Sequence, residues 1–223
     1  RAILASVNVA ATKAARAAQG LHGSISVGVT SSAAAHPLIP QIIRAYRAAY
    51  PEVNIDLRDG NAAELTEEVE DGRLDSAFLR APVARPPTLL FHHLLDEEML
   101  LILPRGHSLI GAKSSLGTPR IALKSIAGEP LVLVRRAGAP GLYANLLLAC
   151  QNAGFVPKIA AEVQHMLLNI SIVAAGIGVS VVPRSLQGIL DDKVVYCRIV
   201  GERPDLVAPL TLVCRANDDS PAE

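Results

Sequence analysis

The sequence has no excess of charge of either sign. Lys+Arg and Asp+Glu each number 21, so the formal net charge of the 223 residues at pH 7 is zero. A domain that binds nucleic acid usually carries a basic excess or a basic stripe on its surface. We therefore do not expect these residues to contact DNA directly.

Long apolar runs and cysteine pairs are also lacking. No apolar run approaches the ~20 residues that a membrane-spanning helix needs, and no signal peptide is visible, so no membrane partner is expected. Cys150, Cys197 and Cys214 are widely spaced and form no CxxC, which argues against a zinc site or a redox pair. We interpret them as small buried hydrophobes, and their odd number as typical of a reducing, cytoplasmic setting.

Catalytic motifs are scarce. The sequence contains no HExxH, GxSxG or Walker loop. Residues 176–181 match GxGxxG only in part, because the third glycine is missing and a strand follows instead of preceding. Residues 92–98 hold two histidines and three acids, which we interpret as an acidic loop in preference to a metal site. We therefore expect a binding protein without enzymatic activity, cofactor or metal.

The segment Ile172–Pro183 contains a helix end, a tight turn and a buried strand within twelve residues. Gly176 is placed to take the left-handed conformation that closes a helix, and the valines that follow favour a strand. The rest of the chain repeats this alternation, which predicts a parallel sheet in an α/β fold. The expected strands are 25–29, 53–57, 74–79, 131–134, 159–163 and 179–182, with a loop at 30–35 and helices from 37, from 61 or 62, and over 141–153 and 165–175.

The two halves of the chain are offset by a nearly constant number of residues. The offset is 106 between Ile25 and Leu131 and 104 between Gly72 and Gly176. This spacing predicts two equivalent Rossmann-like lobes. Strands at 89–95 and 99–103 are expected to lead into the second lobe, and strands at 193–199 and 209–215 to lead back, so two crossing strands join the lobes. Lobe I would comprise 21–95 plus 202–223, and lobe II 96–201.

Four loops follow predicted strands and precede predicted helices, where α/β proteins bind ligands. They are 30–35, 60–63, 135–141 and 164–167. Backbone N–H groups and helix dipoles at such places favour a small organic anion, most simply a carboxylate. The alternative is that the hydroxyl and amide side chains only cap helices, that the arginines are solvated and that the histidine is structural. The candidate side chains from these loops are Thr30, Ser31, Ser32, Asn61, Arg135, Arg136, His165 and Met166.

Several segments, in their order and spacing, resemble LysR-type transcriptional regulators, nearest those of aromatic-compound catabolism. The resemblance extends from about Gly20 to Val213. It implies an effector-binding domain with a type 2 periplasmic-binding-protein-like fold and a small effector in the cleft between its lobes. It also implies homodimers or homotetramers, and DNA binding through an N-terminal winged helix-turn-helix that is missing here. The matching segments are Gly23–Thr30, Leu38–Pro40, Tyr50–Val53, Gly72–Asp75, Pro104–His107 and Val173–Pro183.

The resemblance also implies roles for individual residues. Ser32 matches a serine that helps bind the effector carboxylate in the aromatic-responsive members. A second hydroxyl position of those members falls near Ala62, beside Asn61, so the hydroxyl is missing in this sequence. Pro140 and Leu142 match cleft positions of the second lobe, where Leu142 replaces an aromatic residue of some relatives.

Both ends of the chain have the composition of interrupted helices. Residues 1–20 are rich in alanine and match the end of the family's linker helix, and residues 220–223 have the form of a capping box. We interpret the chain as an excised, effector-sensing domain. The main alternative is a solute-binding protein of a transporter, which would not need the alanine-rich helix. An enzyme on the same fold is disfavoured by the lack of a catalytic set.

Overall fold

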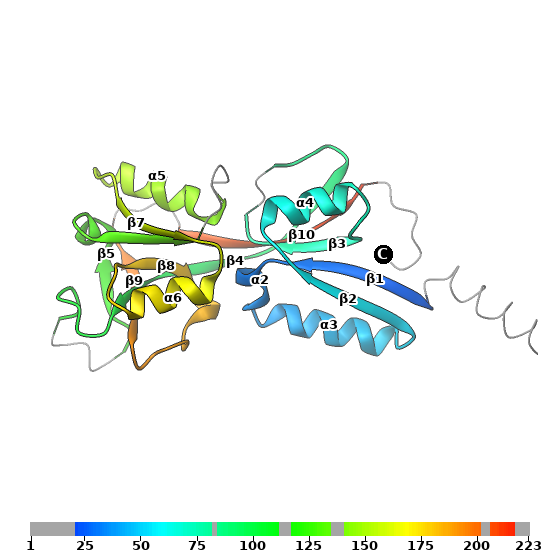
Figure 1. The fold of residues 1–223 in the computed structure, drawn as a ribbon, viewed down its shortest axis with the longest axis horizontal. Coiled ribbons are helices and arrows are strands. Elements are labelled where there is room, and N and C mark those ends of the chain that lie inside the picture. Colours follow the sequence, from blue (N-terminus) through cyan, green and yellow to red (C-terminus); the bar gives the residue numbers. More distant parts are fainter. Residues whose placement is uncertain (1–20, 82–83, 112–116, 135–140, 202–205, 217–223) are drawn as a thin grey trace, which may run out of the picture. The chain divides into compact units, whose positions relative to one another are not determined.

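The computed structural model describes residues 21–81, 84–111, 117–134, 141–201 and 206–216 (Figure 1). The described residues fall into two compact units. The first lies within Arg1–Leu79, Ala84–His92 and Leu212–Glu223, and the second within Arg80–Val83 and His93–Thr211. Strands β4 (Leu89–Pro104) and β10 (Val207–Arg215) each have residues in both units. Two strands therefore carry the chain from one unit to the other, as expected.

The first unit is built on a parallel sheet. Its strands are β1 (Gly23–Val29), β2 (Val53–Asp59) and β3 (Ser76–Leu79), and β1 pairs with both neighbours in parallel. Helices α3 (Leu38–Ala49) and α4 (Ala62–Glu70) connect the strands and lie on opposite sides of them (Figure 1). The inner face of α4 packs on β3 and on the end of β10. The βαβαβ order predicted for this half is confirmed.

One predicted loop in this unit is a short helix. Residues Ser31–Ala34 form α2, where the sequence analysis placed a loop over 30–35. Thr30 has an extended backbone, and its side-chain oxygen accepts a hydrogen bond from the Ala33 N–H at 3.3 Å. A threonine in this conformation is an N-cap, which allows a helical turn to begin even in a Ser/Ala-rich segment.

The second unit has the predicted element order but a different sheet. Strands β6 (Pro130–Val134) and β7 (Lys158–Val163) pair in parallel, and helices α5 (Ala144–Asn152) and α6 (Met166–Ala174) follow them. The expected third strand, β8 (Ser180–Pro183), pairs antiparallel with β4, and an isolated parallel bridge joins Val179, the residue before β8, to Leu131 of β6. The predicted helix over 141–153 begins with a separate 3-10 turn, η2 (Gly141–Tyr143).

The antiparallel part of this unit surrounds β4. Strand β9 (Val194–Val200) pairs antiparallel with β4, and β5 (Arg120–Ala122) pairs in parallel with β9. Strand β10 lies beside β4 in the sheet order. Two short 3-10 helices complete the unit: η1 (Leu123–Ile126) and η3 (Arg184–Leu186).

Strand β4 corrects two predictions. The strands expected at 89–95 and 99–103 are one strand of 16 residues, and the acidic loop expected over 92–98 lies inside it. Within this strand, Glu97 is buried against an arginine, while Glu98 is partly exposed and pairs with Arg184. Strand β9, which was expected to help lead the chain back, lies wholly in the second unit.

Glycines close three helices in the same way. Gly72, Gly154 and Gly176 follow α4, α5 and α6 with φ angles of +71°, +85° and +79°. After α6, the Gly176 N–H donates to the Val173 carbonyl at 2.9 Å and the Ile177 N–H to the Ile172 carbonyl at 3.3 Å. This pair of bonds is the Schellman motif, in which glycine tolerates the left-handed backbone. The left-handed conformation predicted for Gly176 is confirmed.

The free thiols are mostly core residues. Cys150 and Cys197 are fully buried, and burial raises the pKa of each to about 11. Cys214 is only partly buried. Within the described part of the chain, no group of His, Cys, Asp and Glu side chains is arranged to hold a metal ion. No helix there is long and apolar enough to span a membrane.

Gly178 leaves no room for a side chain, which yields a test of the packing between the α6–β8 turn and β6. A Cβ atom at this position would overlap the Pro130 carbonyl group, which already accepts the Val179 N–H at 2.8 Å. We expect Gly178→Ala to lower the free energy of unfolding by about 3 kcal/mol in urea denaturation. Gly128→Ala is the matched control, since nothing lies within 4 Å of its Cβ position. Equal stability of the two variants would contradict the packing described here.

Candidate functional site

In the first unit, two helices begin at the same edge of the sheet. Val29 is paired with Asp59, so Thr30 and Gly60 leave adjacent parallel strands side by side. Helices α2 and α4 start immediately beyond them. Parallel topology therefore brings the two predicted loops of this unit together at the carboxyl ends of their strands.

Side chains cap both helix starts. The Asn61 amide oxygen accepts hydrogen bonds from the N–H groups of Ala63 at 3.1 Å and Glu64 at 3.0 Å, and the Asn61 N–H donates to the Glu64 carboxylate at 3.4 Å. Thr30 caps α2 in a similar way. The capping role that the sequence left open is therefore present for Thr30 and Asn61. Ligand binding by either residue stays a prediction.

The other candidates of this unit differ in exposure. Ser32 is buried in α2, whereas Ser31 is exposed. Ala62 is the first residue of α4, and its carbonyl accepts the Thr66 hydroxyl at 2.6 Å. Ser32 and Ala62 thus lie near the same sheet edge as Thr30 and Asn61, at the starts of two helices.

In the second unit, the corresponding sheet edge lies at the ends of β6 and β7. Val134 is paired with Val163, so β6 and β7 end at the same edge. Arg135, Arg136 and Pro140 fall outside the described residues. His165 is exposed and extended, and its side chain makes no capping hydrogen bond to α6. The first turn of α6 thus differs from that of α4, whose N–H groups bond to Asn61.

At this helix start lies a buried cluster of which the sequence analysis named Met166 but missed Tyr143, Asn169 and Ser180. Met166 is buried, and its sulfur contacts the hydroxyl of fully buried Tyr143 at 3.7 Å, one residue beyond half-buried Leu142. Burial raises the pKa of Tyr143, and a hydrogen bond that involves Ser180 acts in the opposite direction. Tyr143 therefore remains a neutral phenol at physiological pH.

Asn169 joins the same cluster from the second turn of α6. Its amide nitrogen donates to the Val132 carbonyl at 3.1 Å, and the Ser180 hydroxyl donates to the same carbonyl at 2.7 Å. Its amide oxygen is buried and has no hydrogen-bond partner among the described residues. The sequence did contain a signal for this cluster, an asparagine within a nearly continuous apolar helix. Such an asparagine is expected to be buried, and a buried amide needs hydrogen-bond partners.

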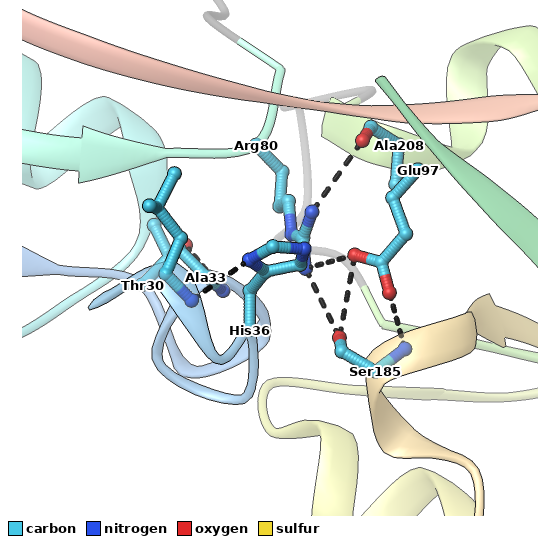
Figure 2. A network of polar contacts seen from close by, with 8 residues as sticks. Thr30, Ala33, His36, Arg80, Glu97, Ser185 and Ala208 are labelled. Carbon is cyan, nitrogen blue, oxygen red and sulfur yellow. Dashed lines mark hydrogen bonds and ion pairs between the residues drawn. The ribbon is translucent and has the colours of Figure 1, made fainter. Parts of the chain in front are cut away.

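A buried ion pair joins Arg80, which directly follows β3, to Glu97 of β4, and both residues belong to the second unit (Figure 2). Arg80 and Glu97 have side chains only 3% and 8% exposed, and a guanidinium nitrogen lies 2.6 Å from a carboxylate oxygen. The Ser185 backbone N–H donates to Glu97, and Arg80 also donates to the Ser185 hydroxyl at 3.2 Å and the Ala208 carbonyl at 3.4 Å. Burial lowers the pKa of Arg80, whereas the charge of Glu97 and their hydrogen bond raise it.

Residues 18–223 match the family model described as "LysR substrate binding domain". The chain is 29% identical over 93% of its length to the HTH-type transcriptional regulator AlsR of Bacillus subtilis (strain 168). It is 30% identical over 100% of its length to the uncharacterized HTH-type transcriptional regulator YnfL of Escherichia coli (strain K12). The chain spans 66% and 72% of the lengths of these two proteins.

Among solved structures, the chain is similar to the BenM effector binding domain with its effector benzoate. The sequence identity is 26%, the TM-score is 0.75, and the match covers 89% of this chain and 86% of that one.

The ion pair yields a prediction about stability. Arg80→Met leaves Glu97 buried without its cation, so we expect the free energy of unfolding to fall by about 3–5 kcal/mol in urea denaturation. The control is Arg73→Met, whose guanidinium is 54% exposed and pairs with exposed Asp71, and which should cost less than about 1 kcal/mol. The double variant Arg80→Met/Glu97→Met should recover much of the loss. A loss in Arg80→Met no larger than in Arg73→Met would refute the assignment.

Proposed function

The chain belongs to the family of LysR substrate binding domains, and from this premise we propose that it senses a small organic anion for a transcriptional regulator. The family membership confirms the resemblance and the fold class predicted from the sequence. The family is one of transcriptional regulators, not of enzymes, and the curated relatives are HTH-type regulators. The alternative of a transporter's solute-binding protein is therefore not favoured.

One structural observation supports an anionic effector most directly. Helix α6 begins at the carboxyl edge of β6 and β7, and no side chain caps it at His165. The N–H groups and the dipole at such a helix start stabilise a negative charge, most simply a carboxylate. Benzoate, the effector named for the BenM domain, is a carboxylate.

We assign the effector contacts to the predicted side chains at the two sheet edges. The first unit would contribute hydroxyl and amide groups, and the second unit the start of α6 with apolar surface from its neighbours. Arg135 and Pro140 remain part of this proposal on the sequence argument alone. The proposed effector contacts that the structure describes are Thr30, Ser31, Ser32, Asn61 and Ala62 in the first unit, and Leu142, His165 and Met166 in the second.

The proposal for the whole protein extends beyond this chain. Since the chain spans 66% of the length of AlsR, we propose that an N-terminal helix-turn-helix outside these residues contacts DNA. The protein would act in the cytoplasm as a homodimer or homotetramer. The effector would bind one conformation of the sensing domain more tightly than another. It would thereby shift the equilibrium between these conformations, to which the DNA-binding part is coupled.

A thermal-shift screen tests the proposal. Benzoate and a panel of other aromatic and aliphatic carboxylates are added to the chain, and an acid that binds the native state should raise the melting temperature with concentration. For the best acid, Ser32→Ala should weaken binding by roughly 1–3 kcal/mol if the hydroxyl holds the carboxylate. Ser24→Ala, an exposed serine in β1, serves as the control and should bind normally.

Two results would count against the proposal. If no acid in the panel shifts the melting temperature, the sensing function fails. If an acid binds with the same affinity to Ser32→Ala and to the unchanged chain, Ser32 has only a structural role in α2.

A further inference from the structure

The second unit contains a cavity of about 190 Å³ whose lining is mostly charged or polar. Three arginines and one glutamate line it, and we refer to it as the triple-arginine pocket. It is built from β4, β5, β9 and η3, and it shares no residue with the proposed effector contacts. Its polar lining comprises Arg120, Arg184, Arg198, Glu98, Thr118 and Gln187.

Strand pairing places two of the arginines directly opposite each other. Arg120 of β5 is the register partner of Arg198 of β9. Like charges at such positions repel, which disfavours the pairing unless something neutralises them. A bound anion at this position would relieve the repulsion between the two side chains.

One carboxylate forms ion pairs with two of the three guanidinium groups. Glu98 approaches Arg198 at 3.2 Å and Arg184 at 3.3 Å. Arg120 makes no ion pair with any residue in the part of the chain that the structure describes. Three positive charges and one negative charge leave a net charge of +2 in a small cavity.

We propose that the triple-arginine pocket binds a phosphate group, either free phosphate or the phosphate of a small monoester. At pH 7 a phosphate monoester carries about −1.5 to −2 charges, which complements the pocket. Planar guanidinium groups donate paired hydrogen bonds to phosphate oxygens, and Thr118 and Gln187 offer neutral donors beside them. The cavity has the volume of about six water molecules, enough for a phosphate group.

Glu98 acts in this pocket as a competitor for the anion. A phosphate that binds Arg184 and Arg198 must displace the Glu98 carboxylate from them. The side chains of Arg184, Arg198 and Glu98 are 56%, 44% and 37% exposed. Exposed ion pairs contribute little stability, so this exchange is inexpensive. Removal of the Glu98 charge should consequently tighten phosphate binding.

The test is an NMR titration of the 223-residue chain with inorganic phosphate, with the ionic strength held constant by chloride. We expect saturable shifts confined to backbone amides of β4, β5, β9 and η3. Arg120→Gln should weaken binding about tenfold, because one charged donor is lost, without a lower melting temperature. Glu98→Gln should tighten binding severalfold. Arg58→Gln, an exposed arginine of β2 in the other unit, is the control and should change nothing.

Further ligands separate the possible sources of the anion. Glycerol phosphate that binds more tightly than inorganic phosphate would support a phosphorylated metabolite, and the reverse order would support free phosphate. Three outcomes would overturn the proposal: no saturation below a concentration on the order of 10 mM, equal affinity in Arg120→Gln and Arg58→Gln, or no tightening in Glu98→Gln. Benzoate or an oligoglutamate peptide that moves the same amides as strongly as phosphate would also overturn it.

Discussion

The buried ion pair of Arg80 and Glu97 holds together segments of the second unit that lie far apart in the sequence. Arg80 directly follows β3, Glu97 lies in β4 just beyond the change of unit, and Ala208 belongs to β10. Removing both charges from water costs about as much as their attraction returns, so the pair adds little net stability. A shift of β4 by one residue would turn Glu97 to the other face of the strand, away from Arg80 and Ser185, so the pair favours the observed register.

Local signals in the sequence predicted most of the element order. Apolar periodicity located the longer helices but not α2, and the glycines after α4 and α6 marked the helix ends because the Schellman motif needs a left-handed residue. Pairing between distant strands was harder to predict. The short apolar strand β8 carries no sign that its main partner is β4 and not β6. Glu97, inside β4, is buried against Arg80, a residue outside the strand that no local pattern connects with it.

The candidate site shows the same division. Parallel topology brings Thr30 and Asn61 to one sheet edge, so their positions could be inferred once the βαβ pattern was recognised. Residue type alone did not decide between a helix cap and a ligand contact. Tyr143 was missed because its role depends on burial, and the triple-arginine pocket because β5 and β9 bring together arginines that are far apart in the sequence.

The turn at Gly178 fixes the packing of α6 against β6. Val179 is hydrogen-bonded to both Pro130 and Val132 across the bridge, and Asn169 and Ser180 both donate to the carbonyl of Val132. The helix cannot slide along the strand without breaking these bonds. Gly178 packs so closely on Pro130 that there is no free space between them. A displacement of the first turn of α6 would therefore have to displace β6 and β8 as well.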